Sequence, residues 1–377
     1  MDLGLNEMQQ MLKTTARAFL DRECPSTLVR AMEEDERGYP PDLWRKLATQ
    51  GWMGLILPDE YGGTGGDFVD LCVLLEEMGR SLLPGPFRST VIQGAIPLMR
   101  HGNHEQKLRF LPQIARGEII LTFAQTETSA TYEPWGIQMK ASASGDNYVL
   151  RGTKLFVHNA HIADYLLVAA RTDADADPVD GVTCFLVPTN SRGINVDILQ
   201  TIASDKQCEV VFEDVEIGRD AIIGNIGEGW AIVQDMNRYA AAAECAWMLG
   251  GAQAVLEMTV DYVKQRVQFD RPIGSFQAIQ HHCANMAMDV ESSRYIAYQA
   301  ACSLVDDVDA SREVAMAKAW VSDAYRRVCA LGHQCHGAIG FTKEHDMQLY
   351  FRRAKAAELA FGDADFHREV VAQALGL

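Results

Sequence analysis

Two clusters of histidine and cysteine contain the side chains best suited to metal chemistry. They are His281-His282-Cys283 and His333-Gln-Cys-His336. Imidazole and thiolate groups bind zinc, but a structural zinc site takes four such ligands at characteristic spacings. No complete set of four accompanies either cluster. We therefore favour helix-face residues with satisfied hydrogen bonds and predict no metal site.

Other short motifs point away from several enzyme classes. The acidic segment at residues 172–180 lacks the glycine and the final glutamate of a calcium loop, so we predict a solvated turn. The run Gly62-Gly-Thr-Gly-Gly66 lacks the Lys-Ser/Thr pair of a phosphate-binding loop and predicts a tight loop. The sequence contains no G-x-G-x-x-G after a strand, no H-E-x-x-H and no G-x-S-x-G, which argues against a Rossmann nucleotide site, a zinc protease and a serine hydrolase.

Three stretches of different periodicity must position any active site. Residues 1–118 place apolar side chains at helical spacing, and residues 226–377 do so again in long runs with few breakers. Residues 119–225 instead contain short β-like runs bounded by Gly, Asp, Asn and Pro. This order predicts an α+β multidomain protein, with an N-terminal all-α domain (1–118), a middle β domain (119–225) and a C-terminal helical bundle (226–377).

The chain is strongly acidic. It has 34 Lys and Arg against 51 Asp and Glu among 377 residues, a formal net charge of −17. Phosphate groups attract basic surfaces, so we predict no nucleic-acid partner and no membrane partner. The start Met-Asp-Leu-Gly-Leu-Asn-Glu-Met is acidic and amphipathic, which predicts neither a signal peptide nor a transit peptide. Nine scattered cysteines without a C-x-x-C motif are typical of the cytoplasm.

Several longer segments form one signature over nearly the whole chain. They are Gly51-Trp-Met-Gly-Leu, Pro58-Asp-Glu-Tyr-Gly-Gly63, Gln125-Thr-Glu127, Gly152-Thr-Lys-Leu-Phe-Val-His-Asn-Ala160, Arg266-Val-Gln-Phe-Asp-Arg-Pro-Ile-Gly-Ser-Phe-Gln-Ala-Ile-Gln280 and Gln334-Cys-His-Gly-Ala-Ile-Gly-Phe341. Each is weak alone, but their order and spacing together resemble the acyl-CoA dehydrogenase family of flavoproteins. The resemblance implies a β-barrel or sandwich for the middle domain and a four-helix bundle for the C-terminal domain.

The resemblance also implies an activity. Family members hold FAD at a subunit interface in a tetramer and oxidise an acyl-CoA thioester to the trans-2-enoyl-CoA. A carboxylate removes the α-proton, the β-hydrogen leaves as hydride to flavin N5, and electrons pass to an electron-transfer flavoprotein. Hydrogen bonds to the thioester carbonyl stabilise the enolate-like charge and lower the pKa of the α-proton.

Ten residues correspond to FAD-binding positions of the family. Thr126 matches a hydroxyl at the polar edge of the flavin, and Phe156 matches an aromatic residue that packs on its ring. Arg266 matches a guanidinium that reaches the pyrophosphate across the interface. Ala338 replaces a glycine and is tolerable if its φ is negative. The others are His158, which replaces a smaller hydroxyl residue, and Phe269, Ile273, Gln277, Gln334 and Gly337.

The match fails at the catalytic base. The two positions at which the family carries a glutamate base hold Phe361 and Asn237, and neither side chain can accept a proton. Asp363 is a weak substitute, since it also suits the N-cap of a helix over residues 366–375. The loop after Glu127 departs as well, because residues 128–134 lack the glycines that many relatives have there.

Three hypotheses therefore remain open. The first is an FAD-dependent acyl-CoA dehydrogenase that acts alone with a displaced base. The second is a base-less subunit of an α2β2 acyl-CoA dehydrogenase, of the kind that acts on steroid-CoA esters, which lends FAD-binding residues across the interface. The third is a flavin monooxygenase or a relative of the nitroalkane oxidases, in which FAD reacts with oxygen. No residue favours this third hypothesis.

Overall fold

The computed structural model describes residues 4–306 and 309–377. The first three residues of the predicted acidic N-terminus lie outside this part. The chain divides into two compact units, of which one comprises Met1–Ala31, Asp67–Leu83 and Ala241–Leu377 and the other Met32–Gly66 and Pro84–Ala240. We call them the helical unit and the sheet unit and describe each separately.

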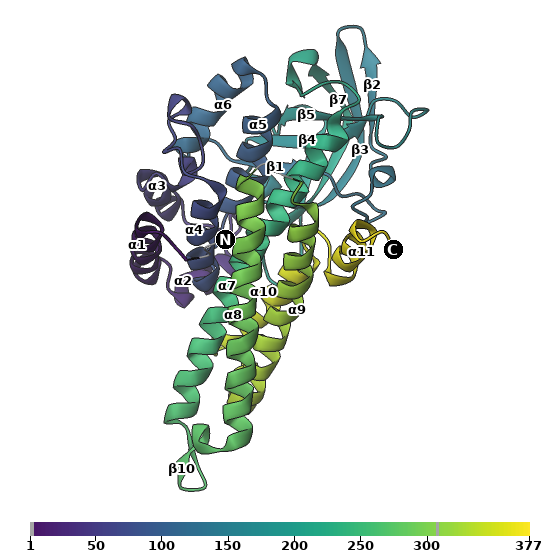
Figure 1. The fold of residues 1–377 in the computed structure, drawn as a ribbon. Helices are drawn as coiled ribbons and strands as arrows, with labels where there is room; N and C mark the ends of the chain where they lie inside the picture. Colours follow the sequence, from purple (N-terminus) through teal and green to yellow (C-terminus); the bar gives the residue numbers. More distant parts are fainter. Residues whose placement is uncertain (1–3, 307–308) are drawn as a thin grey trace. The chain divides into compact units, whose positions relative to one another are not determined.

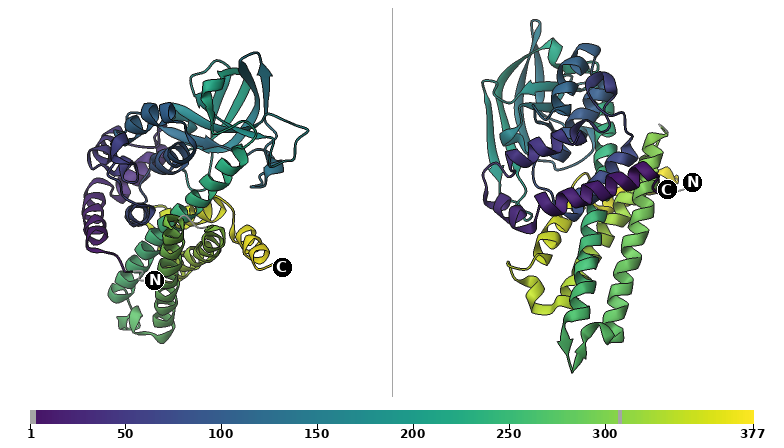
Figure 2. Two further views of the ribbon diagram at one scale, coloured as in Figure 1. Left: turned by 45° about the horizontal axis from the view of Figure 1, so that its top comes forward. Right: turned by 90° about the vertical axis from the view of Figure 1, so that its left-hand side faces the viewer.

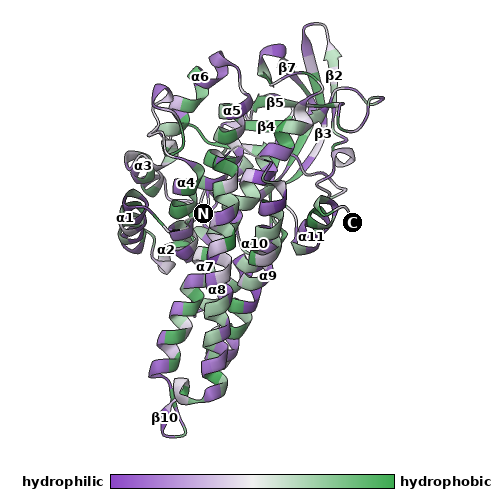
Figure 3. Ribbon diagram, viewed as in Figure 1, coloured by the Kyte–Doolittle hydropathy of each residue, from purple (hydrophilic) through white to green (hydrophobic). Residues whose placement is uncertain are grey.

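The sheet unit is built on one eight-stranded sheet (Figure 1). Its strands have the order β6-β7-β3-β2-β4-β5-β8, and β1 pairs with β4 in parallel. The strands are β1 (Leu121–Ala124), β2 (Lys140–Ser144), β3 (Asn147–His158), β4 (Tyr165–Arg171), β5 (Val182–Pro188), β6 (Ile194–Leu199), β7 (Gln207–Gly218) and β8 (Ile222–Ile223). Strands β4 and β5 are buried along most of their length and are coloured hydrophobic in Figure 3, as expected for the core of a sheet.

Short helices complete the sheet unit. They are α3 (Pro41–Thr49), the single turns η1 (Trp52–Gly54) and η2 (Asp59–Tyr61), the π-helix η3 (Ser89–Ala95), α5 (Ile96–His101) and α6 (His104–Ala115). The glycine-rich segment at residues 51–66 forms a loop, as predicted, because a Cβ on Gly63 would lie only 1.9 Å from the Leu57 carbonyl oxygen. The π-helix packs on β1, where the Thr90 hydroxyl approaches the backbone of Leu121.

The helical unit contains the predicted bundle. Its helices are α1 (Glu7–Glu23), most of α2 (Ser26–Glu34), α4 (Phe68–Arg80), the greater part of α7 (Gly229–Gln265), α8 (Gln277–Val305), α9 (Ser311–His336), α10 (Met347–Leu359) and α11 (Ala364–Ala374). Both views of Figure 2 show α8 and α9, in green, side by side. A hairpin of β9 (Val267–Gln268) and β10 (Arg271–Pro272) connects α7 to α8 at one end of the bundle. Between α9 and α10 lies the single turn η8 (Gly337–Phe341).

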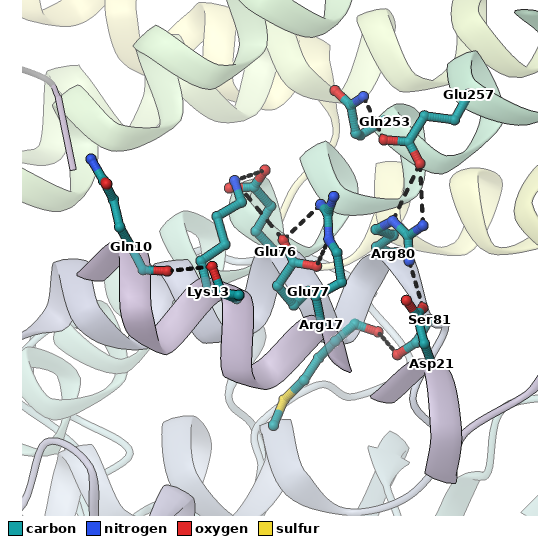
Figure 4. Close-up of polar contacts among 12 residues, drawn as sticks. Gln10, Lys13, Arg17, Asp21, Glu76, Glu77, Arg80, Ser81, Gln253 and Glu257 are labelled. Atoms are coloured by element: carbon teal, nitrogen blue, oxygen red, sulfur yellow. Dashed lines mark hydrogen bonds and ion pairs between the residues drawn. The ribbon is translucent and has the colours of Figure 1, made fainter. Parts of the chain in front are cut away.

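Charged side chains join α1, α4 and α8 within the helical unit, and Figure 4 shows the part of this network between α1 and α4. Glu76 is 1 % exposed, and its carboxylate accepts hydrogen bonds from Lys13 Nζ at 2.8 Å and from the Tyr298 hydroxyl at 2.7 Å. Arg294 forms a further ion pair with it. Burial raises the pKa of Glu76, but Lys13 and Arg294 outweigh burial and lower it overall. The network therefore fixes the register of these helices. In the part of the chain that the structure describes, no helix has the length and hydropathy of a membrane span.

Candidate functional site

A buried ion pair anchors the first predicted flavin residue, Thr126, in the sheet unit. The Glu127 carboxylate accepts hydrogen bonds from Lys154 Nζ at 2.7 Å and from the backbone N–H groups of Gln138 and Met139. Lys154 is fully buried and also donates to the carbonyl of Gln125. Burial lowers the pKa of Lys154, and the carboxylate of Glu127 opposes that shift. Since residues 125 and 127 are both held, the backbone at Thr126 is fixed.

The second predicted flavin residue, Phe156, has a strained backbone. Its φ is 57°, a left-handed value that is rare for a bulky side chain, and 49 % of its surface is exposed. The ladder between β3 and β7 is irregular between Lys154 and Val157, and Leu155 N–H bonds the carbonyl of Thr126 at 2.8 Å. This bulge turns an aromatic face out of the sheet. Strain of this kind is typical of functional positions.

His158 ends the same strand and lies near a carboxylate. Burial raises the pKa of Asp205, but the proximity of His158 and hydrogen bonds from Thr201 and Gln207 lower it overall. The segment after β1, which contains Thr126, lies beside the end of β3, which contains Phe156 and His158. The structure therefore brings these three residues together.

The predicted pyrophosphate residues lie at the hairpin of the helical unit. Arg266 follows the last residue of α7, and its carbonyl accepts a hydrogen bond from Ile273 N–H at 2.8 Å. Phe269 has φ 52° and is 85 % exposed at the tip. Asp270 has φ 62°, and the neighbouring Arg271 stacks on the ring of Phe276 at 4.1 Å. Arg266 and Phe269 are thus exposed to solvent. A side chain that binds a ligand on another subunit would need such exposure. The fourth residue of this set, Gln277, is the first residue of α8.

The predicted adenosine residues lie at the end of α9 and in η8. Gln334 is in the last turn of α9, and Gly337 begins η8 with φ 65°. A Cβ on Gly337 would meet nothing within 4 Å, so its backbone borders open space. Ala338 is not among the residues with positive φ, which is the condition that we set for it.

These residues fit FAD in their chemistry. The sheet unit offers an exposed aromatic face and a hydroxyl, which suit the flavin ring, and the helical unit offers a guanidinium and an open backbone turn, which suit phosphate and adenosine. In the described ranges, no group of three or more His, Cys, Asp or Glu side chains could hold a metal ion.

The turn that carries Phe361 is held from beneath by two buried side chains. Lys318 Nζ donates hydrogen bonds to the carbonyls of Glu358 and Gly362 at 3.1 and 2.8 Å, and His367 Nε2 bonds the carbonyl of Phe361 at 2.9 Å. Phe361 has φ 58° and Gly362 has φ 93°. The turn is thus ordered and shaped to present residue 361, but the residue it presents has no acid–base function.

The second base position holds a paired amide. Asn237 on α7 and Gln125 after β1 exchange two hydrogen bonds, at 3.0 and 3.1 Å. The nearest acidic residue on this part of the helix, Asp235, is bound by Arg100, His101 and Arg238. Its pKa is lowered well below the usual range because these hydrogen bonds outweigh burial. Asp235 is therefore a stable anion and a poor proton acceptor.

Asp363 serves as the N-cap of α11. Its side chain accepts a hydrogen bond from Phe366 N–H at 2.9 Å, and its backbone is extended, with φ −82° and ψ −178°. This geometry matches a helix cap, and the carboxylate is engaged in the capping hydrogen bond.

Sequence reasoning missed the two residues that hold the Phe361 turn, Lys318 and His367. Lys318 lies on the buried side of α9, among Val314, Ala315 and Val321, and it is fully buried. A lysine in such a position is the one signal that could have identified it, because lysine is almost never fully buried without a partner.

Comparison with known proteins agrees with the geometry. Three family models match, described as the acyl-CoA dehydrogenase N-terminal domain (residues 6–118), middle domain (122–215) and C-terminal domain (227–376). A relative described as a probable acyl-CoA dehydrogenase, YngJ of Bacillus subtilis, is 31% identical over 384 residues and covers 100% of both chains.

Two solved structures are similar over the whole chain. Butyryl-CoA dehydrogenase from Megasphaera elsdenii has a TM-score of 0.93 at 29% identity and covers 100% of both chains. The ChsE4–ChsE5 complex from Mycobacterium tuberculosis has a TM-score of 0.91 at 28% identity and covers 100% of this chain and 99% of that one. The chain belongs to the acyl-CoA dehydrogenase family. It is accordingly an FAD-dependent oxidoreductase of the class that acts on the CH–CH bond of acyl-CoA thioesters.

Proposed function

We propose that this chain is the base-less member of a mixed acyl-CoA dehydrogenase tetramer. The observation that carries the proposal is the hydrogen-bonded turn at 358–363, in which Phe361 stands at the base position, Asp363 is a helix cap and Glu358 pairs with Lys355. General-base catalysis is worth about 10²–10⁴-fold in rate, so a chain without a base needs a partner subunit that has one. The similarity to a two-protein complex supports this choice.

The chain's own residues have binding roles in this proposal. Arg266 holds the pyrophosphate of an FAD whose ring lies on the partner, and Gln277, Gln334 and Gly337 complete that cofactor site. Thr126, Phe156 and His158 form a ring platform on the chain itself, where Phe156 excludes water. When bound, FAD supplies the acceptor for the β-hydrogen of the substrate.

The wider setting is also proposed. The acceptor of the electrons is an electron-transfer flavoprotein, which is the acceptor that the family resemblance implies. The location is the cytoplasm, since all nine cysteines are free and seven are buried. The pathway is the catabolism of fatty acids or of steroid side chains.

The decisive measurement is the number of FAD molecules bound per subunit. Purified alone, the chain should hold fewer FAD than subunits and should desaturate acyl-CoA slowly or not at all. Co-expressed with a related subunit that has the glutamate, it should form a mixed tetramer, visible by light scattering. A homomer with one FAD per subunit and rapid turnover alone would instead support a chain that acts by itself.

A substitution tests the missing base directly. Phe361→Glu places a carboxylate on a turn that is already ordered, so it should raise the rate of butyryl-CoA oxidation by at least about tenfold. Phe361→Gln is the matched control, because it has the same size and no proton-accepting function. Equal rates in the two variants would argue that residue 361 does not face the substrate.

A further inference from the structure

Two buried histidines underlie the turn η8 without satisfied ring nitrogens. His333 and His336 are each 4 % exposed. Among the described residues, neither ring nitrogen of His333 has a hydrogen-bond partner, and neither has Nε2 of His336. Buried polar groups nearly always find partners, because an unsatisfied one costs about 1–3 kcal/mol. The arrangement therefore needs a physical explanation.

The ring of His333 serves as an aromatic surface on which η8 rests. It stacks on Phe341 with a centroid distance of 4.5 Å and an angle of 18°, and it meets Phe351 edge-on at 4.8 Å. A Cβ added to Gly340 would lie 3.1 Å from Nδ1 of His333, so the backbone of η8 lies directly against the ring. These contacts suit a flat, neutral ring.

The second histidine, His336, lies in an aromatic stack of its own beside that of His333. His336 stacks on Tyr262 at 4.4 Å and 23°, and its Nδ1 contacts the carbonyl of Gly332 at 2.8 Å. The ring of His345 lies 4.9 Å away, edge-on. Three imidazoles thus occupy one side of the turn that we assign to the adenosine of FAD.

Burial disfavours charge on these three imidazoles. Burial, followed by the proximity of His336 and His345, lowers the pKa of His333. Burial is also the main cause of the lowered pKa of His336 and of His345. Of the other charged groups on the elements packed here, Asp346 raises the pKa of His345 and Arg30 lowers it. Lys343, Glu344 and Arg352 complete the charged residues of the turn after η8 and of α10 nearest to it.

We infer that His333 is a positioning residue for the FAD cradle, and that its neutral ring makes the retention of FAD dependent on pH. This inference rests on the proposed assignment of Gln334, Gly337 and Ala338 to the cofactor. A proton on His333 would bury a charge whose N–H groups have no acceptor in the described part of the chain, so we expect the ring to leave the stack with Phe341, free η8 and release the adenosine half of FAD. A proton on His333 and FAD on the turn therefore exclude each other.

The test measures FAD dissociation against pH in the assembly that the protein forms. Flavin fluorescence should give a dissociation constant that is constant near pH 8 and rises as the pH falls below the lowered pKa of His333, by up to about tenfold per pH unit for one coupled proton. His333→Phe keeps the aromatic surface and cannot titrate. It should bind FAD within about threefold of wild type at pH 8 and lose most of the pH dependence.

Two further variants complete the experiment. His333→Leu is apolar and also cannot titrate, so its pH profile should be as flat as that of His333→Phe even if its affinity is lower. His281→Asn, an exposed histidine on α8, should keep the wild-type profile. A wild-type profile in His333→Phe or His333→Leu would overturn the inference, as would tight wild-type binding that is constant from pH 8 to 5. An assembly that binds no FAD even at pH 8 would overturn the proposed cofactor site, and the inference with it.

Discussion

The two fully buried lysines of the molecule support two similar turns by different means. Lys154 in the sheet unit and Lys318 in the helical unit are both 0 % exposed. Each lies next to a turn on which a phenylalanine has a left-handed backbone, Phe156 with φ 57° and Phe361 with φ 58°. Lys154 has a carboxylate partner at 2.7 Å, whereas Lys318 has two carbonyls and the Ser322 hydroxyl.

The difference shows what each turn needs from its lysine. A buried ion pair is stable only when both charges are present, because a single buried charge is very costly. The Lys154 turn is therefore locked, as a surface that supports a cofactor must be. Lys318 forms no ion pair in the described part of the chain, so it is a donor of hydrogen bonds whose charge is poorly compensated. Burial lowers its pKa accordingly.

Removing Lys154 should have the largest effect. Lys154→Met leaves Glu127 buried without its counterion, and we expect a loss of about 3–5 kcal/mol in the free energy of unfolding, measured by urea denaturation. Glu127→Gln in the Lys154→Met background should recover part of that loss, since no charge then remains. Lys140→Met, at an exposed position of β2, is the control. An additive double mutant would contradict the view that the two residues act as a pair.

Acid should weaken the Phe361 turn through His367. Burial, then the charge of Lys318, lowers the pKa of His367 from its ordinary 6.5 to about 4. The unfolded chain takes up a proton on His367 below pH 6.5 while the folded chain does not, so the stabilising effect is complete above 6.5 and is lost as the pH falls to about 4. The loss should reach ~3 kcal/mol at most.

The comparison of unfolding curves at pH 7.5 and 4.5 isolates this contribution. His367→Gln keeps a donor for the Phe361 carbonyl and cannot titrate, so it should lose less stability than wild type between the two pH values. If both proteins lose the same amount, His367 is not responsible.

Removing Lys318 should cost less than removing Lys154. Lys318→Met leaves two carbonyls unsatisfied but also removes a buried charge, so we expect a loss of about 1–3 kcal/mol. Lys264→Met, at an exposed position of α7, is the control. A loss as large as that of Lys154→Met would mean that Lys318 has a tightly bound counterion, and the contrast between the two lysines would fail.

The sequence predicted the order of helical and β regions well, because apolar patterning determines it. The strands with long apolar runs, β4 and β5, lie where they were expected. Strand β2 was not expected, since it reads Lys-Ala-Ser-Ala-Ser and buries a single residue. Its position depends on the hydrogen bonds of β3 rather than on its own hydropathy.

The candidate site was only partly accessible from the sequence. The ten FAD-binding residues were predicted from sequence motifs. The structure shows which of them have a strained backbone or an exposed side chain. Of the residues that support the turns, Lys318 acts across 40 and 44 residues of chain, His367 bonds the carbonyl of Phe361 six residues before it, and His333 acts through stacking. Spacing along one helix does not reveal such contacts, because they depend on how helices pack.

The smallest effect is expected at Asp363, the acid that caps α11 at the end of the turn that the contrast concerns. As an N-cap, it can be replaced by Asn with almost no loss of stability, within about 0.5 kcal/mol, because Asn caps equally well, whereas Asp363→Ala should cost about 1 kcal/mol. The same reasoning forecasts that Asp363→Asn leaves the rate of acyl-CoA oxidation by the mixed assembly unchanged, since the carboxylate is committed to Phe366 N–H. Were Asp363 a displaced base, Asn would instead abolish activity while preserving the fold. Measuring stability and rate on the same two variants therefore separates a cap from a catalyst, and a stable but inactive Asp363→Asn protein would overturn the base-less assignment of this chain.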